Sequence, residues 1–322
     1  MSVKDDVLGL LTDRDGPLSG EWLARKLGVT RNAVWKAIEA LRREGFVIEA
    51  ATNRGYRLVS GPEILSIPQI KKWMRPGEIG TPMEIHSRLD STHRLAKLRA
   101  ADGALHGFLV LAESQSSGRG RMGRSFFSPE HTGVYATYIL RPHMHVEQAV
   151  LLTSLAAVAV ARAIEAVADV EVRIKWVNDL YINGKKVCGI LCEAGMDFES
   201  GQLEYAVLGI GVNVTAMAFP EALSGIATSI ENECGAHVSR SRLIAEITNQ
   251  LNDLYPQLAT GAFMPENRSR SNVIGREVEV LQGDRRYMAR AMDIDERGRL
   301  VVKTPNGIVR LDSGEVSLRF AR

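Results

Sequence analysis

The chain has few cysteines, and their scarcity argues against two kinds of stabilised fold. Among its 322 residues only Cys188, Cys192 and Cys234 are cysteine. They form no C-x-x-C pair and no histidine cluster accompanies them, so we expect neither a disulfide framework nor a metal site. Cys188 and Cys192 fall in a predicted strand, where they are expected to act as small buried hydrophobic residues.

An excess of one charge sign and long apolar runs are also missing. The chain has 40 Lys and Arg against 38 Asp and Glu, a formal net charge of +2 that does not by itself indicate a nucleic-acid partner. Residues 1–6 lack the basic-then-apolar pattern of a signal peptide. The longest apolar run, residues 149–161, is interrupted by Thr153 and Ser154 and is too short to span a bilayer. We therefore expect a cytoplasmic protein with no membrane contact.

Residues 113–129 combine arginines with glycines in one short stretch. Glycines permit unusual backbone conformations, while guanidinium groups and bare amides bind anions, so the pattern predicts a loop that closes over a phosphate or carboxylate. With little apolar content, residues 115–128 are expected to be mobile until a ligand binds. A basic loop without a ligand is the alternative. The interleaved residues are Gly118, Arg119, Gly120, Arg121, Gly123 and Arg124.

The same glycines spell G-x-G-x-x-G, a spacing typical of dinucleotide-binding proteins. That fingerprint requires a strand before it and a helix opening directly on it. A strand is predicted before it at residues 108–112, but a turn and a second strand, residues 134–140, follow. The context therefore argues against a dinucleotide site.

A second stretch, residues 175–193, contains a predicted hairpin. The dipeptide Asn183-Gly184 between two β-type runs is a strong hairpin signal. A two-residue turn would put Asp179 diagonally next to Lys186 on one face and Asn178 with Lys185 on the other. A common surface ion pair is the alternative. The expected cross-strand pairs are Ile182 with Lys185, Tyr181 with Lys186, and Asp179 with Cys188.

Together these motifs resemble a known family. GRGRMGR, KWVNDLY and KKVCGILCE, preceded by DSTH at residues 90–93, are similar to the motifs of biotin protein ligases, above all of the bacterial bifunctional type that is also a biotin-responsive transcriptional repressor. The resemblance covers essentially the whole chain. It implies the substrates biotin and ATP with Mg²⁺, and no permanently bound cofactor.

The resemblance also implies a reaction and its partners. Biotin's carboxylate attacks the α-phosphate of ATP to give biotinyl-5′-AMP, and a lysine of the biotin carboxyl carrier protein of acetyl-CoA carboxylase then displaces AMP. The second implied activity is repression of biotin genes, with operator double-stranded DNA as partner and a homodimer when biotinyl-AMP is bound. Two alternatives stay open, a lipoate-type ligase and a biotin-sensing repressor without ligase activity. The DNA-binding module and the loop of residues 113–129, called the arginine loop below, argue against the first alternative. Asn178, Asp179 and Lys186 argue against the second.

Individual residues receive roles from the same resemblance. The implied catalytic residues are Lys186, Arg121 and Asp179. The implied biotin-binding residues are Ser91, Thr92, His93, Gln115, Arg119, Gly120, Arg121 and Lys186. The implied adenylate-binding residues are Arg121, Phe126, Asn178 and Asn213. The chain departs from the family pattern at four positions, with His93 for Asn, Met122 for Arg, Phe126 for Trp and Val177 for Pro. An aromatic ring at 126 still stacks on adenine.

Residues 1–62 are predicted to form a winged helix-turn-helix. Ser19 caps a second helix to Leu27, and residues 28–30 form the turn before a third helix from Arg31 to about Glu44. With ten basic and eight acidic side chains in residues 1–60, the module is only weakly basic. A helical docking domain that binds no DNA fits the order of elements less well. The expected DNA-binding residues are Arg31, Asn32, Trp35, Lys36 and Arg54.

The predicted fold class is α+β. Residues 63–271 are expected to form a ligase domain with a mixed sheet and packed helices, including a helix that Ser91 or Thr92 caps. In a strand at residues 204–214, Gly209 and Gly211 allow close approach to the backbone, by the adenylate according to the resemblance. Residues 272–322 are expected to form a small SH3-like β-barrel. Its five strands are placed at 277–281, 287–294, 300–303, 308–311 and 316–319.

Overall fold

The computed structural model forms two compact units, Met1–Ile64 and Leu65–Arg322. It describes residues 3–12, 16–43, 45–51, 55–61, 63–142, 144–145, 149–196, 199, 201–282, 285–312 and 315–318. The domain boundaries after residues 62 and 271 stay predictions.

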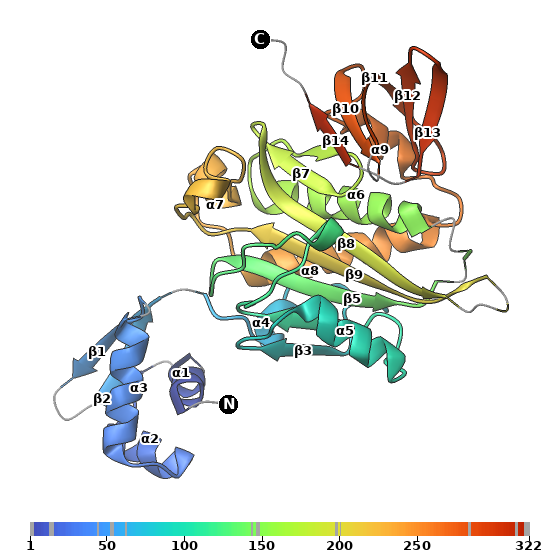
Figure 1. The fold of residues 1–322 in the computed structure, drawn as a ribbon. Helices are drawn as coiled ribbons and strands as arrows, with labels where there is room; N and C mark the ends of the chain where they lie inside the picture. Colours follow the sequence, from blue (N-terminus) through green and yellow to red (C-terminus); the bar gives the residue numbers. More distant parts are fainter. Residues whose placement is uncertain are drawn as a thin grey trace. The chain divides into compact units, whose positions relative to one another are not determined.

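The first unit has the predicted order of helix, turn, helix and wing (Figure 1). The Ser19 hydroxyl accepts a hydrogen bond from Trp22 N at 3.0 Å, and Gly28 ends the second helix in the left-handed conformation at φ 66°. Thr30 Oγ1 accepts from Ala33 N at 3.2 Å to start the third. The elements are α1 Val3–Thr12, α2 Gly20–Leu27, α3 Arg31–Arg43, β1 Val47–Ala51 and β2 Gly55–Ser60.

A seven-stranded mixed sheet is the centre of the second unit. Its strand order is β3-β4-β5-β9-β8-β7-β6, with β3 and β4 parallel and the other pairs antiparallel. The predicted mixed sheet is therefore confirmed. The strands are β3 Met83–His86, β4 Leu109–Ala112, β5 Gly133–Leu140, β6 Arg173–Lys175, β7 Asp179–Ile182, β8 Lys185–Met196 and β9 Leu203–Asn213.

Helices cover both faces of this sheet (Figure 1). Alternation along β4 sends Leu109 and Leu111 into the large core with α6 and α8, and Val110 into a smaller core with α5. The α5 face carries the candidate site. The helices are α4 Ile67–Lys71, α5 Thr92–Ala101, α6 Ala149–Val167, α7 Ile230–Cys234, α8 Arg240–Leu254 and α9 Met264–Ser269, with 3₁₀ turns η1 Arg121–Gly123, η3 Glu221–Leu223 and η4 Tyr255–Gln257.

Helix α6 is longer than the apolar run suggested. It has 19 residues and, by length and composition alone, is long and apolar enough to cross a membrane. However, 72% of its most apolar window is buried inside the protein. Leu152 and Leu155 are part of the large core, so the helix serves as a core helix of the second unit.

The five strands predicted for the C-terminal barrel are present and form an antiparallel sheet in the order β13-β12-β11-β10-β14. Its inward residues, among them Val278 and Val302, belong to the same large core as α6. Trp176 Nε1 also donates to Gly298 O at 2.9 Å, which fixes the turn before β12 to the segment after β6. The strands are β10 Glu277–Gln282, β11 Arg285–Ile294, β12 Leu300–Thr304, β13 Gly307–Leu311 and β14 Glu315–Leu318.

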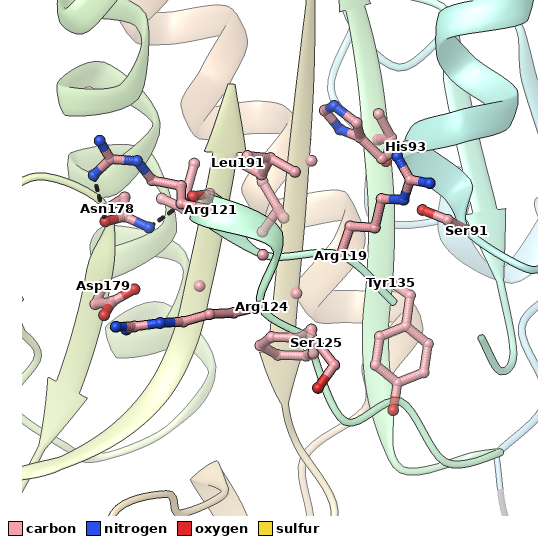
Figure 2. Close-up of a pocket in the computed structure, with 18 of the residues that line it drawn as sticks. Ser91, His93, Arg119, Arg121, Arg124, Ser125, Tyr135, Asn178, Asp179 and Leu191 are labelled. Atoms are coloured by element: carbon pink, nitrogen blue, oxygen red, sulfur yellow. Dashed lines mark hydrogen bonds between the residues drawn. The ribbon is translucent and has the colours of Figure 1, made fainter. Parts of the chain in front are cut away.

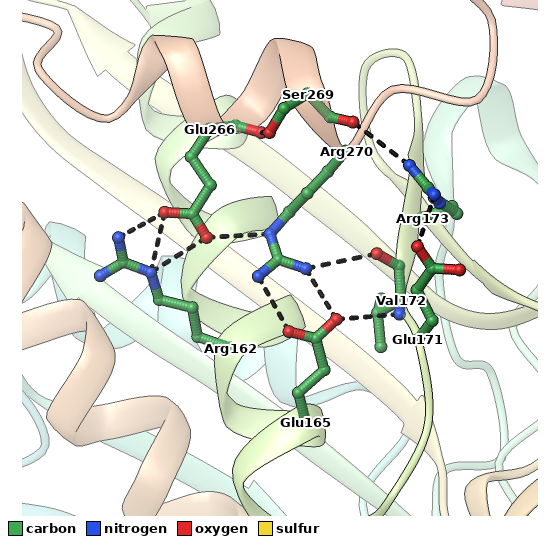
Figure 3. A network of polar contacts seen from close by, with 8 residues as sticks. All are labelled: Arg162, Glu165, Glu171, Val172, Arg173, Glu266, Ser269 and Arg270. Carbon is green, nitrogen blue, oxygen red and sulfur yellow. Dashed lines mark hydrogen bonds and ion pairs between the residues drawn. The ribbon is translucent and has the colours of Figure 1, made fainter.

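A polar network ties α6 to α9 and to the chain entering β6 (Figure 3). Arg270 donates to both Glu165 oxygens at 2.7 and 2.8 Å, and its Nε donates to Glu266 Oε1 at 2.9 Å. Burial would raise the pKa of Glu266, but hydrogen bonds from Arg162 and Arg270 lower it below its usual range. Val172 N donates to Glu165 Oε1 at 3.0 Å. The network therefore holds the segment that leads into the KWVND motif.

The three cysteines, all within the described ranges, are free thiols. Cys188 is buried, as expected, and burial raises the pKa of its thiol far above the usual range. Cys192 packs against the large core but is only partly buried, so it fits the expectation less closely than Cys188. On β8 it points to the other side of the sheet from its neighbours Leu191 and Glu193.

Candidate active site

A pocket lies over the centre of the large sheet, on the face that α5 covers (Figure 2). The arginine loop encloses it, and β5, β8 and β9 form its floor. The structure thus brings the two motif stretches and the DSTH segment together. The predicted residues that line it are Ser91, Thr92, His93, Gln115, Arg119, Gly120, Arg121, Phe126, Asn178, Asp179 and Lys186.

Lys186 and Asp179 form an ion pair inside the pocket. Lys186 Nζ donates to Asp179 Oδ1 at 2.6 Å, and the side chains are 30% and 21% exposed. The predicted proximity of these two side chains is confirmed. The carboxylate holds the ammonium in place while leaving it charged, so Lys186 can bind a second anion.

The predicted register of the hairpin is only partly correct. Ile182 does pair with Lys185 and Tyr181 with Lys186, but the register then shifts, and Asp179 lies opposite Gly189 instead of Cys188. The reason is a β-bulge on β8, which inserts one extra residue after Lys186. A single bulge moves every later pairing by one residue.

Asn178 does not lie on the opposite face with Lys185, as the alternation had predicted. It precedes β7 in a turn, where strand alternation does not apply, and it lines the same pocket as Asp179. Its Nδ2 donates to Ile190 O at 3.0 Å, and its Oδ1 accepts from Arg121 Nη1 at 3.2 Å. Asn178 therefore fixes the arginine loop to strand β8 (Figure 2).

The arginine loop has a defined fold with hydrogen bonds across it. Gly120 N donates to Arg124 O at 2.7 Å, and Phe126 N donates to Gly118 O at 2.9 Å. A Cβ at Gly118 would lie 2.5 Å from Phe126 O, so this position requires glycine, whereas the nearest atom at Gly120 would be 3.5 Å away. The expected mobility without ligand stays a prediction.

Glycines on the floor make room for two side chains. A Cβ at Gly211 would lie 2.7 Å from the Phe126 ring, and one at Gly209 would lie 2.9 Å from His93 Nδ1. The side chains of Phe126 and His93 thus lie against these glycines, and the approach of the adenylate to the same strand stays a prediction. Gly189 pairs with Gly211 across β8 and β9, and a Cβ there would lie 3.4 Å from the Phe126 ring.

The N-terminus of α5 does not use the predicted caps. Thr92 Oγ1 and N both donate to Gln115 Oε1, at 3.1 and 2.9 Å, so the hydroxyl is engaged across the pocket wall. Ser91 occupies the N-cap position, but within the described part of the chain its buried hydroxyl makes no hydrogen bond. The prediction that either hydroxyl caps the helix is wrong.

Asn213 lies outside the pocket lining and has a supporting position. It is buried, and its Nδ2 donates to Thr228 O at 3.0 Å. Thr228 N in turn donates to Lys186 O at 2.8 Å, and Lys186 N donates to Ile226 O at 2.8 Å. Asn213 thus anchors the segment that pairs with the backbone of Lys186, and it does not face the pocket as the resemblance implied.

The charges of the pocket favour an anion. Among the described residues that line it, Asp179 is the only carboxylate. Sequence reasoning missed Lys175, which precedes Trp176 in the KWVND motif, and Val316, which comes from β14 with no local signal. Nowhere in the described ranges do three His, Cys, Asp or Glu side chains form a group that could hold a metal ion. The cationic lining residues are Arg119, Arg121, Arg124, Lys175 and Lys186.

In the first unit, four predicted DNA-binding residues lie on the exposed face of α3. Arg31, Asn32 and Lys36 are exposed, and Trp35 is 51% exposed, which is unusual for a tryptophan without a partner surface. The fifth, Arg54, lies outside the described residues.

Three family models match separate parts of the chain. The Biotin/lipoate A/B protein ligase family matches residues 85–213, an HTH domain matches residues 4–57, and the biotin protein ligase C-terminal domain matches residues 273–319. The bifunctional ligase/repressor BirA of Bacillus subtilis (strain 168) is 37% identical over 306 residues, 94% of each chain. The BirA protein of Escherichia coli (strain K12) is 28% identical over 311 residues, covering 94% of this chain and 93% of its own.

A solved structure has a similar fold. The biotin protein ligase from Aquifex aeolicus in complex with biotin and ATP aligns with a TM-score of 0.64 and 25% identity, covering 75% of this chain and 100% of its own.

Proposed function

Because the chain belongs to the biotin protein ligases of the bifunctional ligase/repressor kind, we propose that it makes biotinyl-5′-AMP from biotin and ATP and transfers biotin to a lysine of a biotin carboxyl carrier protein. The observation that carries this proposal is the pocket in which Lys186, held by Asp179, faces the arginine loop. A site rich in fixed cations and backbone amides suits a reaction in which charge builds on phosphate oxygens.

In the first step, a biotin carboxylate oxygen attacks the α-phosphorus of ATP, and the bond to the β-phosphate bridging oxygen breaks as pyrophosphate leaves. Lys186 would contact both the carboxylate and the α-phosphate, and Arg121 would neutralise phosphate charge from the loop. Phe126, whose ring packs against Gly211, would offer its ring to the adenine. No covalent enzyme intermediate is needed.

In the second step, a neutral lysine amine of the carrier protein attacks the carbonyl carbon of the mixed anhydride. The C–O bond to phosphate breaks, AMP leaves, and the new amide nitrogen loses a proton. The same cations that stabilised the first transition state would stabilise the phosphate of departing AMP.

Mg²⁺ is proposed to arrive as part of the ATP substrate. Magnesium commonly binds through nucleotide phosphates with only one or two protein carboxylates. The single carboxylate in the described lining, already paired with Lys186, fits a metal that the nucleotide carries better than one that the protein holds.

Incubation with ATP and either radiolabelled biotin or lipoate tests the substrate. We expect labelled biotinyl-adenylate and labelled carrier protein with biotin alone. Labelling by lipoate and not by biotin would contradict the assignment and favour the lipoate alternative. Binding of biotin with no adenylate formed would favour a sensor without ligase activity.

For the repressor activity, we propose that the chain binds operator double-stranded DNA and forms a homodimer when biotinyl-AMP is bound. We also propose that it works in the cytoplasm and without membrane contact.

Residues 63–322 alone are expected to keep ligase activity and to lose DNA binding, because the first unit has its own core. Footprinting on the biotin promoter and carrier labelling measure the two activities. A truncated protein that still protects the same DNA would show that the DNA-binding assignment is wrong.

A point variant in the full chain makes the same test without truncation. Lys36→Ala should weaken DNA binding and leave ligation unchanged, because it removes an exposed cation from the predicted reading face. Arg25→Ala is the matched control, since Arg25 is equally exposed but lies on α2 and pairs with Glu21 at 3.4 Å.

Arg121→Gly is expected to open the loop and release the adenylate faster. The change removes the 3.2 Å hydrogen bond from Arg121 Nη1 to Asn178 Oδ1, which joins the loop to the segment before β7. Free adenylate should then biotinylate nearby lysines without selectivity, and ligand-induced dimerisation should weaken. Adenylate release, labelling of bulk protein and sedimentation measure these effects.

The proposed cause is ordering of the loop by ligand, which would make one surface available either to the carrier or to a second subunit. Hydrogen exchange of residues 115–128 should slow when biotinyl-AMP binds. Equal protection with and without ligand, or dimerisation that ignores the ligand, would contradict this coupling.

A further inference from the structure

Glu113 lies outside the pocket, at the point where strand β4 passes into the arginine loop. Its side chain is buried, and its carboxylate lies among three polar partners. Leu65 N donates to Oε1 at 2.6 Å, Arg240 Nη1 donates to Oε2 at 2.6 Å, and His131 Nδ1 lies 3.2 Å from Oε2. These four residues are all described by the structure, and none of them lines the pocket. The cluster therefore makes no direct contact with the reacting groups.

The cluster joins the two stems of the arginine loop. Glu113 begins the loop, and His131, just after the loop ends, donates from its backbone N to Glu113 O at 3.3 Å. Arg240, from α8, also donates from Nη1 to Gly133 O at 3.4 Å, at the start of β5. One buried arginine thus binds the segment that enters the loop and the strand that leaves it.

Backbone hydrogen bonds continue from these stems towards the tip of the loop and form a ladder across it. The tip carries Arg121, which donates to Asn178 Oδ1 at 3.2 Å (Figure 2). A change of position at the stems is therefore passed on to the cation at the tip. The rungs of the ladder, each from a backbone nitrogen to a backbone oxygen, are His131 to Glu113 at 3.3 Å, Gln115 to Ser128 at 3.1 Å, Phe126 to Gly118 at 2.9 Å and Gly120 to Arg124 at 2.7 Å.

The charges of the cluster suit the fixing of a position better than the supply of stability. Burying two ions costs free energy, so an apolar pair of similar volume often stabilises a fold as well or better. A carboxylate that accepts charge-assisted bonds also fixes the direction of each bond, which apolar packing does not. The cluster therefore sets how Glu113, His131 and Arg240 lie relative to one another.

We propose that Glu113 is a positioning residue for the formation of biotinyl-adenylate: with Arg240 and His131 it fixes the stems of the arginine loop, and the ladder thereby fixes Arg121 at the pocket. Glu113 itself touches neither the ligand nor the reacting atoms. This inference rests on the proposed function. A displacement of about 1 Å at a group that acts on the transition state can lower the rate by about 10²-fold, so a small shift of the stems has a measurable effect.

Glu113→Gln tests the proposal, because it keeps the size of the side chain and removes its charge. An amide has one oxygen and brings two N–H donors, so it cannot accept from Leu65 N, Arg240 and His131 together. The rate constant of single-turnover adenylate formation should fall about tenfold or more, and release of the adenylate should become faster by a similar factor. A role in folding alone would lower the fraction of active protein and leave both rate constants unchanged.

Glu266→Gln is the matched control. Glu266 is a partly buried carboxylate that accepts from Arg162 Nε at 3.0 Å and from Arg270 Nε at 2.9 Å, and it is not among the described residues that line the pocket. Glu165 still binds Arg270 and Val172 N in this variant, so the segment before β6 keeps these contacts. The variant should unfold at lower urea concentration and keep wild-type rate constants.

A double variant, Glu113→Leu with Arg240→Met, separates stability from position. Exchange of both charges for apolar side chains should restore stability relative to Arg240→Met alone. The rate constant of adenylate formation should nevertheless stay about tenfold or more below wild type, because no charged bond then directs the stems.

Wild-type rate constants in Glu113→Gln or in the double variant would overturn the proposal. Failure of the underlying function looks different, because wild-type protein would then form no biotinyl-adenylate.

Discussion

Lys186→Ala is expected to lower the rate of biotinyl-adenylate formation by on the order of 10²-fold or more while the protein stays folded. Lys186 is partly exposed and contributes no apolar core contact, but its ammonium is fixed by the 2.6 Å bond to Asp179 in a pocket of cations. Loss of one preorganised charge that acts on the transition state lowers kcat more than it changes substrate affinity. Single-turnover formation of adenylate, together with a circular dichroism spectrum, measures the effect.

The neighbouring residue provides a matched control. Lys185 lies on the same strand, is more exposed, and approaches Glu233 only at 4.0 Å. Lys185→Ala should leave adenylate formation close to wild type. Near-wild-type adenylate formation by Lys186→Ala would remove the catalytic assignment of Lys186, whatever the control shows.

Arg240→Met is expected to lower the free energy of unfolding of the second unit by about 3–5 kcal/mol, because it leaves a buried carboxylate without its main partner. Arg240 Nη1 donates to Glu113 Oε2 at 2.6 Å, and the two side chains are 1% and 5% exposed. Urea unfolding of residues 63–322 measures the change. Arg75→Met is the control, because its pair with Asp253 is about half exposed and such pairs contribute below about 1 kcal/mol.

A double variant tests whether the missing partner causes the loss. Glu113→Leu combined with Arg240→Met replaces both charges by apolar side chains, and buried pairs exchanged in this way are often neutral. The double variant should therefore be more stable than Arg240→Met alone. If the losses in unfolding free energy of Glu113→Leu and Arg240→Met simply add up in the double variant, the missing partner is not the cause.

The same pair gives a pH dependence. Burial would raise the pKa of Glu113, but hydrogen bonds from His131, Arg240 and Leu65 N lower it below its usual range. Since the folded-state pKa is below the unfolded one, the stabilisation is present above the unfolded value and is lost as pH falls through the folded value. The difference in free energy of unfolding between wild type and Arg240→Met should therefore become smaller as pH falls.

Local sequence signals predicted the elements well, because the forces that set them are local. Ser19, Thr30 and the glycine after α2 fix helix ends through bonds to nearby backbone atoms. Asn183-Gly184 fixes the tip of the hairpin for the same reason. The paired motifs also placed most of the pocket residues together, although their individual roles stay predictions.

What the sequence could not predict depends on contacts between distant segments. The bulge on β8 and the position of Asn213 against Thr228 follow from packing that no periodicity encodes. Gly209 and Gly211 indicated close approach, but only the fold shows that His93 and Phe126 fill the space. Val316 joins the pocket because the C-terminal sheet packs on the core of the larger one.

That shared core limits how the chain can be recombined with its relatives. The match to the ligase family ends at residue 213 and the match to the C-terminal domain begins at residue 273, so a chimaera could be joined between them. A crossover there would separate Arg162 and Glu165 from Glu266 and Arg270, and Trp176 from Gly298. A hybrid joined inside this stretch would build one hydrophobic core from residues of two different proteins. Exchange of everything from Leu65 onward would keep that core within one protein.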